Sequence, residues 1–229
     1  MMATKKPKKF ESKSWRESAA ARKQRLSVIL GELTNLYPDA NCALHFDNPW
    51  ELLVATILSA QCTDERVNKE TPALFSRYPT VESMAKAPIE DLEQLVKRTG
   101  FYRNKARAIS ESAKAIVDRY ESNLPKSMED LLTLRGVARK TANVVLGTAY
   151  GITSGIVVDT HISRLSQRLG LTRQKDPEKI EQDLMKLLDS KHWVFFGHAL
   201  IWHGRKVCNA RKPKCPECSL QKLCPSMTL

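Results

Sequence analysis

The sequence has little of what β-sheet and membrane proteins need. Aromatic residues make up 7% of the 229 residues, glycine occurs nine times, and no stretch shows sustained alternation of polar and β-branched residues. No segment reaches the roughly 18 apolar residues that a membrane-spanning helix needs. The N-terminal lysines are not followed by an apolar segment, so a secretory signal is not expected. These shortages disfavour an all-β chain and a membrane protein.

An intracellular location is therefore expected, and it bears on the six cysteines. In a reducing compartment, cysteines are more often free or metal-bound than paired in disulfides.

Acidic residues are also in short supply. The chain has 25 Asp and Glu against 37 Lys and Arg, which gives a net charge of +12. This charge favours a polyanionic partner, either nucleic acid or an anionic membrane, over a merely soluble basic protein. Residues 1–20 are lysine-rich and aperiodic, and we interpret them as a flexible basic arm attracted to phosphate or, equally well, as an inert solubilising tail.

The remaining chain is a succession of helix patterns joined by short loops, so the expected fold class is all-α. Leu26, Ile29, Leu30 and Leu33 share one helical face, and Asn48 begins a helix that is apolar almost all round. Start and stop signals predict helices at 21 to near 38, 50–60, 63–77, 88–100, 102–120, 127–134, 138–150, 159–170, 176–188 and 193–202.

Four cysteines near the C-terminus form a C-x6-C-x2-C-x5-C pattern: Cys208, Cys215, Cys218 and Cys224. This run has too few apolar residues to fold alone, whereas a metal centre would order it. Structural zinc usually shows two short cysteine pairs, and only one is present here, so the spacing favours a [4Fe–4S] cluster over zinc. Between the first two cysteines, Arg211, Lys212 and Lys214 offer a phosphate contact surface or simply a solvated charge run.

A second informative segment is a short helix, a turn built on Gly136, and a longer helix. Backbone N–H groups beside a helix N-terminus suit a DNA phosphate, and such a contact does not depend on base sequence. We expect DNA contacts from the turn and from the start of the second helix: Arg135, Gly136, Val137, Ala138 and Arg139.

Lys140 lies in the first turn of that helix, where the helix dipole and Arg139 disfavour a protonated amine. A neutral amine there could act as a nucleophile, although a surface lysine that binds phosphate is the more common case. Asp159 follows an apolar pair and opens another helix. It is either a plain N-cap or a carboxylate that stabilises positive charge on a sugar as its base leaves.

Together these segments resemble the endonuclease III family of helix–hairpin–helix DNA glycosylases. LSAQCTD at 58–64, LRGVARKTANVVL at 134–146, VDTHI at 158–162 and the cysteine tail occur in the family's order and approximate spacing. The resemblance implies two helical domains that flank a DNA cleft and a [4Fe–4S] cluster on the four tail cysteines. One domain is a six-helix barrel with the hairpin, at 42–152, and the other is a cluster domain formed by 21–41 and 153–229.

The resemblance also implies a function and residue roles. The enzyme would remove oxidised pyrimidines from duplex DNA and cut 3′ to the abasic site by β-elimination, with Lys140 as nucleophile and Asp159 as its partner. Gln61 would fill the space left by a flipped nucleotide, Phe101 would wedge near the opposite strand, and His161 would contact the lesion side. The expected partner is double-stranded DNA with an oxidised pyrimidine or abasic site, and we expect a monomer in the bacterial cytoplasm, at the nucleoid, without a membrane partner.

The hairpin departs from the family pattern, which usually reads Leu-Pro-Gly-Val-Gly. Arg135 stands in place of the proline, which loosens the turn, and Ala138 puts a methyl group where backbone approaches phosphate. We expect intact chemistry with altered DNA affinity, and Arg135 could compensate with a phosphate contact. The spacing from Lys140 to Asp159 is one residue longer than usual, which the loop at 151–155 can absorb.

Three other functions compete with this interpretation. Adenine-mispair glycosylases usually lack a lysine at the position of Lys140 and carry an extra C-terminal domain, whereas this sequence has the lysine and ends five residues after Cys224. A non-catalytic DNA-binding module would not need both Lys140 and Asp159. A redox sensor has no support in the sequence.

Overall fold

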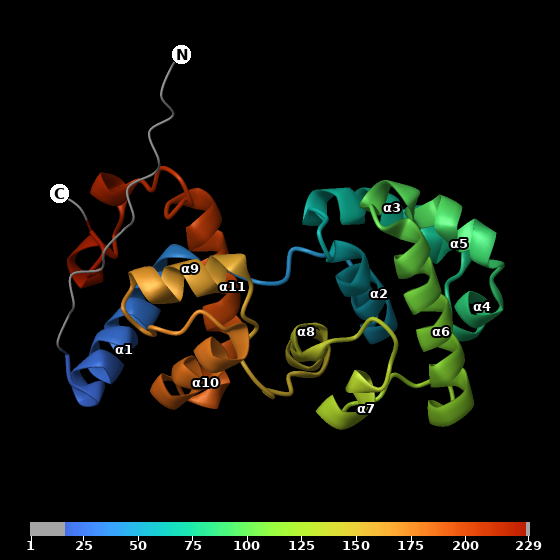
Figure 1. Ribbon diagram of the computed structural model, residues 1–229, viewed down its shortest axis with the longest axis horizontal. Helices are drawn as coiled ribbons and strands as arrows, with labels where there is room; N and C mark the ends of the chain where they lie inside the picture. Colours follow the sequence, from blue (N-terminus) through green and yellow to red (C-terminus); the bar gives the residue numbers. More distant parts are fainter. Residues whose placement is uncertain (1–16, 228–229) are drawn as a thin grey trace, which may run out of the picture. The chain divides into compact units, whose positions relative to one another are not determined.

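The computed structural model describes residues 17–227, and this part of the chain is all-α with no strand, as predicted (Figure 1). Most of the expected basic arm, residues 1–16, lies outside the described residues. The last residues of the expected arm belong to the start of a helix. Ser18 caps α1 by accepting a hydrogen bond from the Ala21 N–H at 3.1 Å. The first helix therefore begins two residues earlier than the sequence predicted.

Cap residues set most helix starts, as the sequence predicted. Asn48, Thr63, Ser127, Asp159 and Asp176 each accept a backbone N–H in the first turn of the helix that follows. The α-helices are α1 (Ala19–Leu36), α2 (Pro49–Ser59), α3 (Asp64–Arg77), α4 (Val81–Lys86), α5 (Ile89–Val96), α6 (Tyr102–Tyr120), α7 (Met128–Leu132), α8 (Arg139–Tyr150), α9 (Thr160–Arg168), α10 (Pro177–Leu187) and α11 (Trp193–Lys206). Short 3-10 turns are η1 (Lys97–Thr99), η2 (Ser190–His192), η3 (Cys215–Glu217) and η4 (Gln221–Leu223).

Three helix predictions need correction. Helix α4 was not predicted, because its six residues are too few for a periodic pattern, although a Thr80–Ser83 capping box starts it. The helix after Ser127 ends at Leu132 and not at Leu134. The last helix continues to Lys206, past the predicted end at Trp202.

The chain divides into two compact units, and the first is Cys42–Ser154. Its centre is α2, whose apolar run predicted burial, and residues Leu52–Ala55 of that helix are fully inaccessible to solvent. The long helix α6 packs against α4, α5 and α2, and α8 packs against α2 and α7. This unit carries the hairpin formed by α7 and α8.

The second unit consists of the other described residues, 17–41 and 155–227. Helix α1 packs against α10 and α11, and α9 packs against α11, so the first helix of the chain shares a core with the last three (Figure 1). Phe196 of α11 is the largest side chain that is completely buried in this core. No helix among the described residues is long and apolar enough to cross a bilayer.

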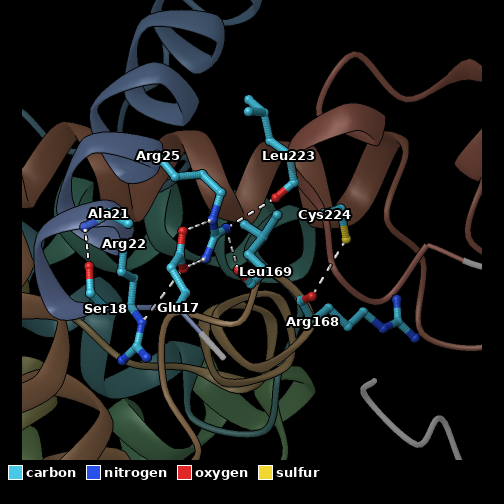
Figure 2. Close-up of polar contacts among 9 residues, drawn as sticks. All are labelled: Glu17, Ser18, Ala21, Arg22, Arg25, Arg168, Leu169, Leu223 and Cys224. Atoms are coloured by element: carbon cyan, nitrogen blue, oxygen red, sulfur yellow. Dashed lines mark hydrogen bonds and ion pairs between the residues drawn. The ribbon is translucent and has the colours of Figure 1, made fainter. Parts of the chain in front are cut away.

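A buried arginine joins three segments of the second unit (Figure 2). The Nη1 group of Arg25 donates to the carbonyl of Leu169 at 2.7 Å and to that of Leu223 at 3.0 Å. Its Nε and Nη2 groups donate to the two carboxylate oxygens of Glu17 at 3.0 and 2.8 Å, which lowers the pKa of that carboxyl. Arg25 thereby ties α1 to the end of α9 and to the cysteine tail.

Candidate active site and metal centre

The hairpin turn between α7 and α8 is fixed by two contacts with α6. Gly136 has a φ of +76°, and a Cβ there would lie 2.8 Å from the Cβ of Ala108, so the turn needs glycine for both conformation and space. The hydroxyl of Ser112 donates to the carbonyl of Arg135 at 2.9 Å. Val137, expected to contact DNA as part of the turn, is buried, and its N–H donates to the carbonyl of Leu134 at 3.2 Å. Its side chain therefore serves packing of the turn.

The start of α8 is built as an open helix N-terminus. Ala138 occupies the N-cap position and has no side-chain acceptor for the first N–H groups. In an α-helix those groups have no partner within the helix, so they remain suited to an anion. Lys140 is exposed in this first turn, and Arg139 beside it is half-buried. The arrangement places a lysine amine at a helix end that can hold a phosphate.

Arg135, the replacement for the family's proline, is engaged within the chain. Its Nη1 group lies 3.2 and 2.9 Å from the two carboxylate oxygens of Glu111 in α6. Both side chains are about half exposed, at 48% and 46%, so water screens the pair and the pair contributes little to stability. A DNA phosphate would have to compete with Glu111 for this guanidinium.

Gln61 and Phe101 share an unusual backbone conformation in the first unit. Gln61 has a φ of +54° and Phe101 has a φ of +48° with ψ of +30°, the left-handed region that non-glycine residues rarely adopt. Both are exposed, and the Phe101 side chain is 63% accessible. Glu121 and Ser122, at the end of α6, also have positive φ, so the conformation does not by itself assign a DNA contact, and the roles of Gln61 and Phe101 stay predictions.

Asp159 is the N-cap of α9 in the second unit. One carboxylate oxygen, Oδ1, accepts the N–H of Ile162 at 2.8 Å, and the side chain is half-buried. The capping bond fixes the orientation of the carboxylate at the start of α9. His161 packs closely on α11, because a Cβ at Gly204 would lie 2.8 Å from the His161 Nδ1. Lys140 belongs to the unit Cys42–Ser154, whereas Asp159 and His161 belong to the other.

The four tail cysteines line one apolar pocket in the second unit, together with Leu165, Leu169 and Leu220. No disulfide joins any of the six cysteines, all of which lie among the described residues. Burial raises the pKa of Cys218 to about 11 and also raises the pKa of Cys224, so thiolates here need a compensating positive charge. Among residues 17–227, no three or more His, Cys, Asp or Glu side chains are placed to hold a single metal ion. Four thiols around a shared pocket fit a larger, polynuclear centre.

Two arginines of α9 hold the segment that carries the first of these cysteines. Arg168 lies 3.2 Å from the Cys208 sulfur through Nη1, and it donates to the carbonyls of Asn209 and Ala210, each at 2.8 Å. Arg164 donates to the carbonyl of Cys208 at 3.0 Å, and the same nitrogen lies 3.2 Å from Nδ1 of His161. The helix that begins at Asp159 is thus fastened to the cysteine tail at its other end.

A neutral histidine contacts another of the cysteines. Burial lowers the pKa of His203 to about 4, so the ring is uncharged near pH 7. Its Nε2 lies 3.5 Å from the Cys218 sulfur, and its Nδ1 lies 3.1 Å from the hydroxyl of Tyr37 in the loop after α1. Neither this pair nor the two arginines were predicted. Arg164 and Arg168 are spaced four residues apart on one helical face, but that spacing alone does not reveal what they contact.

The basic segment between the first two cysteines is at the surface. Arg211, Lys212 and Lys214 are all exposed, as a phosphate-contacting segment requires. A solvated charge run would be exposed in the same way, and both interpretations agree with this placement.

Comparison with known proteins places these features in a family. Residues 54–190 match the model of the HhH-GPD superfamily base excision DNA repair proteins. The endonuclease III of Synechocystis sp. is 56% identical over 207 residues, which are 90% of this chain and 94% of the relative. The endonuclease III of Bacillus subtilis is 42% identical over 202 residues, 88% of this chain and 92% of that protein.

The fold agrees with these sequence relationships. The solved structure of a non-covalent endonuclease III–DNA complex matches with a TM-score of 0.83 and 44% identity, covering 88% of this chain and 94% of the other. A trapped endonuclease III–DNA covalent intermediate matches with the same TM-score and identity, covering 88% and 95%. The chain therefore belongs to the endonuclease III family of helix–hairpin–helix base excision DNA repair proteins.

Proposed function

We propose that this chain removes oxidised pyrimidines from duplex DNA and cuts the strand 3′ to the resulting abasic site, with Lys140 as the nucleophile. Family membership makes it a DNA glycosylase and abasic-site lyase of base excision repair. The observation that carries the assignment of Lys140 is its position. Its amine is exposed in the first turn of α8, at a helix N-terminus that lacks a side-chain cap.

Binding begins with the DNA backbone. The uncapped N–H groups at the start of α8 hold one phosphate, and Arg139, Arg211, Lys212 and Lys214 add attraction that does not depend on base sequence. Extrusion of the damaged nucleotide costs a few kcal/mol of stacking. Gln61 and Phe101 offset part of this cost by occupying the space left in the duplex and by wedging beside the opposite strand.

The chemistry is a displacement followed by an elimination. The neutral amine of Lys140 forms a bond to C1′ while the bond from C1′ to the base breaks, and the electron pair leaves with the base, which takes up a proton. The nitrogen then loses one proton, and the sugar ring opens as O4′ takes up a proton. The resulting Schiff base keeps the second proton on nitrogen, and its positive charge acidifies the C2′ hydrogens. Loss of one C2′ proton expels the 3′ phosphate, and water then hydrolyses the Schiff base and frees Lys140.

Asp159 supports these steps by electrostatics. Its carboxylate stabilises the positive charge that develops at C1′ as the base departs, because an oriented negative group gains most where charge develops in the transition state. The capping bond from the Ile162 N–H holds the carboxylate in a single orientation. His161, two residues after Asp159 and in the first turn of α9, contacts the lesion side.

The proposed cofactor is a [4Fe–4S] cluster bound by Cys208, Cys215, Cys218 and Cys224. When bound, it supplies positive charge and structural order to the tail, and it takes no part in the displacement or the elimination. Arg168 beside the Cys208 sulfur and neutral His203 beside the Cys218 sulfur orient those two side chains. The ordered tail in turn displays the basic segment 211–214. With chromosomal DNA as its substrate, the enzyme would act at the bacterial nucleoid, as a monomer.

Borohydride trapping tests the proposed function. It reduces a Schiff base to a stable covalent adduct, so the wild type should give adducts with a duplex that contains thymine glycol and with one that contains an abasic site. Lys140→Ala should give neither, whereas Lys114→Ala, a change at an exposed lysine of α6, should behave as wild type. Adducts are measured on a denaturing gel.

The other outcomes of trapping are equally informative. Adduct retained by Lys140→Ala would assign the nucleophile to another amine. Adduct with the abasic duplex alone would exclude thymine glycol as a substrate. No adduct with either duplex, at intact DNA binding, would identify a non-catalytic binding module.

The metal content tests the cofactor. The purified protein should be yellow-brown, with about four irons per chain by elemental analysis. Cys215→Ser should lose most of that iron because it removes a ligand, whereas Cys42→Ser, at a cysteine packed on the core of the other unit, should retain it. Zinc in place of iron, or equal loss of iron in both variants, would reject the cluster.

Ala138 tests the phosphate site at α8. Ala138→Gly removes the methyl group that hinders close approach of a phosphate, so the dissociation constant for duplex DNA should fall about threefold. Ala138→Ser is the matched control, because it keeps a Cβ and adds a hydroxyl that competes for the same N–H groups. Affinity is measured by fluorescence anisotropy. An unchanged constant in Ala138→Gly would show that the methyl group does not limit phosphate binding.

A further inference from the structure

A lysine of the first unit is buried without a carboxylate partner. Lys105, near the start of α6, is 5% exposed. Its Nζ group donates to the carbonyl of Leu58 at 2.8 Å and to the carbonyl of Thr99 at 2.7 Å. Within residues 17–227 no acidic side chain forms an ion pair with it. Its hydrogen-bond partners are thus two main-chain oxygens, and the Cys62 thiol is the titratable group that acts on the ammonium.

An apolar side chain would fill this position without the desolvation free energy that a charged one requires. Removing an ammonium group from water is unfavourable, and this desolvation lowers the pKa of Lys105. Lys105 also lies on the apolar stripe of α6, in line with Ile109, Ser112 and Ile116, where sequence alone would place a hydrophobic side chain. A buried ammonium group at such a position indicates that its hydrogen bonds hold the Leu58 and Thr99 carbonyls in a specific arrangement.

The positions of the two carbonyls show which segments Lys105 holds together. Leu58 lies in the last turn of α2, whose carbonyls lack helical partners and form the negative end of the helix dipole. Gln61 follows three residues later. Thr99 ends η1, and Phe101 follows two residues later. One amine thus binds the bases of the two loops that carry Gln61 and Phe101.

Each loop also has a local bond of its own, and neither of these bonds joins one loop to the other. The N–H of Cys62 donates to the carbonyl of Ser59 at 3.0 Å, and the hydroxyl of Thr99 donates to the carbonyl of Val96 at 2.8 Å. The hydrogen bonds of Lys105 connect the two loop bases directly. Loss of both bonds would leave two buried carbonyls without a donor and would let the loops move independently.

We propose that Lys105 is a positioning residue that couples the Gln61 and Phe101 loops, so that both side chains enter a base-paired duplex as one unit. This inference rests on the proposed function, because it assumes that these residues stabilise the extruded nucleotide. Lys105 touches neither the DNA nor Lys140 in this scheme. Its contribution should therefore appear only when the substrate has a paired strand to open.

The test compares two substrates for borohydride trapping by the full-length protein with its metal centre. One is a duplex that contains thymine glycol, and the other is a single strand that contains an abasic site and needs no duplex opening. Lys105→Met keeps the length of the side chain and removes the donor. Lys105→Arg restores a donor, and Lys114→Met removes an exposed lysine from the same helix as a control.

Lys105→Met should trap the duplex on the order of tenfold more slowly, because small displacements of positioning groups have effects of this size or larger. Its rate on the single strand should stay within about twofold of wild type, and Lys105→Arg should recover part of the duplex rate. An equal loss on both substrates would show a merely structural role, and no loss on the duplex would reject the coupling. No adduct from the wild type on either substrate would overturn the proposed function, and this inference with it.

A second measurement leaves Lys105 unchanged, in case Lys105→Met does not fold. Gln61→Ala and Phe101→Ala are combined in a double-mutant cycle on duplex trapping. Coupled loops predict that the double variant departs from the product of the two single effects by about threefold or more. Independent effects of the two substitutions would overturn the inference.

Discussion

The four tail cysteines line one apolar pocket, and a positive centre bound there would offset the charge of their thiolates. Burial raises the pKa of Cys218 to about 11 and also raises the pKa of Cys224, which reflects the cost of ionising these thiols without such a centre. The tail from 207 to 227 contains the short 3-10 turns η3 and η4 and no α-helix. It is held by Arg168, by Arg164 and, through Leu223, by Arg25 of α1.

Helix α9 connects the anchored tail to the proposed catalytic carboxylate. Its first turn is capped by Asp159, and its later turns carry the two arginines that hold the Cys208 segment. A metal centre that orders the tail would therefore also fix the helix on which the proposed catalytic carboxylate stands. Helix α6 has the corresponding role in the first unit, where Ser112 fixes the hairpin turn before Lys140 and Lys105 binds the bases of the Gln61 and Phe101 loops.

Features that depend on neighbouring residues in sequence could be predicted, and features that depend on distant ones could not. Asn48, Thr63 and Asp159 predict helix starts because a cap side chain binds a backbone N–H three residues later. The apolar run after Asn48 predicts a buried helix. The cysteine spacing and the Gly136 turn are equally local. In contrast, Lys105 binds the carbonyl of Leu58, which is 47 residues away in sequence, and Arg168 contacts the sulfur of Cys208, which is 40 residues away. No sequence pattern predicts such pairs. The burial of the Val137 side chain could not be predicted for the same reason, because it depends on packing within the whole unit.

The proposed metal centre would support catalysis by fixing α9 and thereby Asp159, in addition to ordering the basic segment 211–214. Hydrogen exchange followed by mass spectrometry, on the metal-bound protein and on protein stripped by chelation, tests this claim most directly. The account predicts that amides of α9 and of the tail exchange at least about tenfold faster without metal, whereas those of α2 and α6 in the other unit are unchanged. Unchanged protection of α9, or loss of protection throughout both units, would contradict the claim.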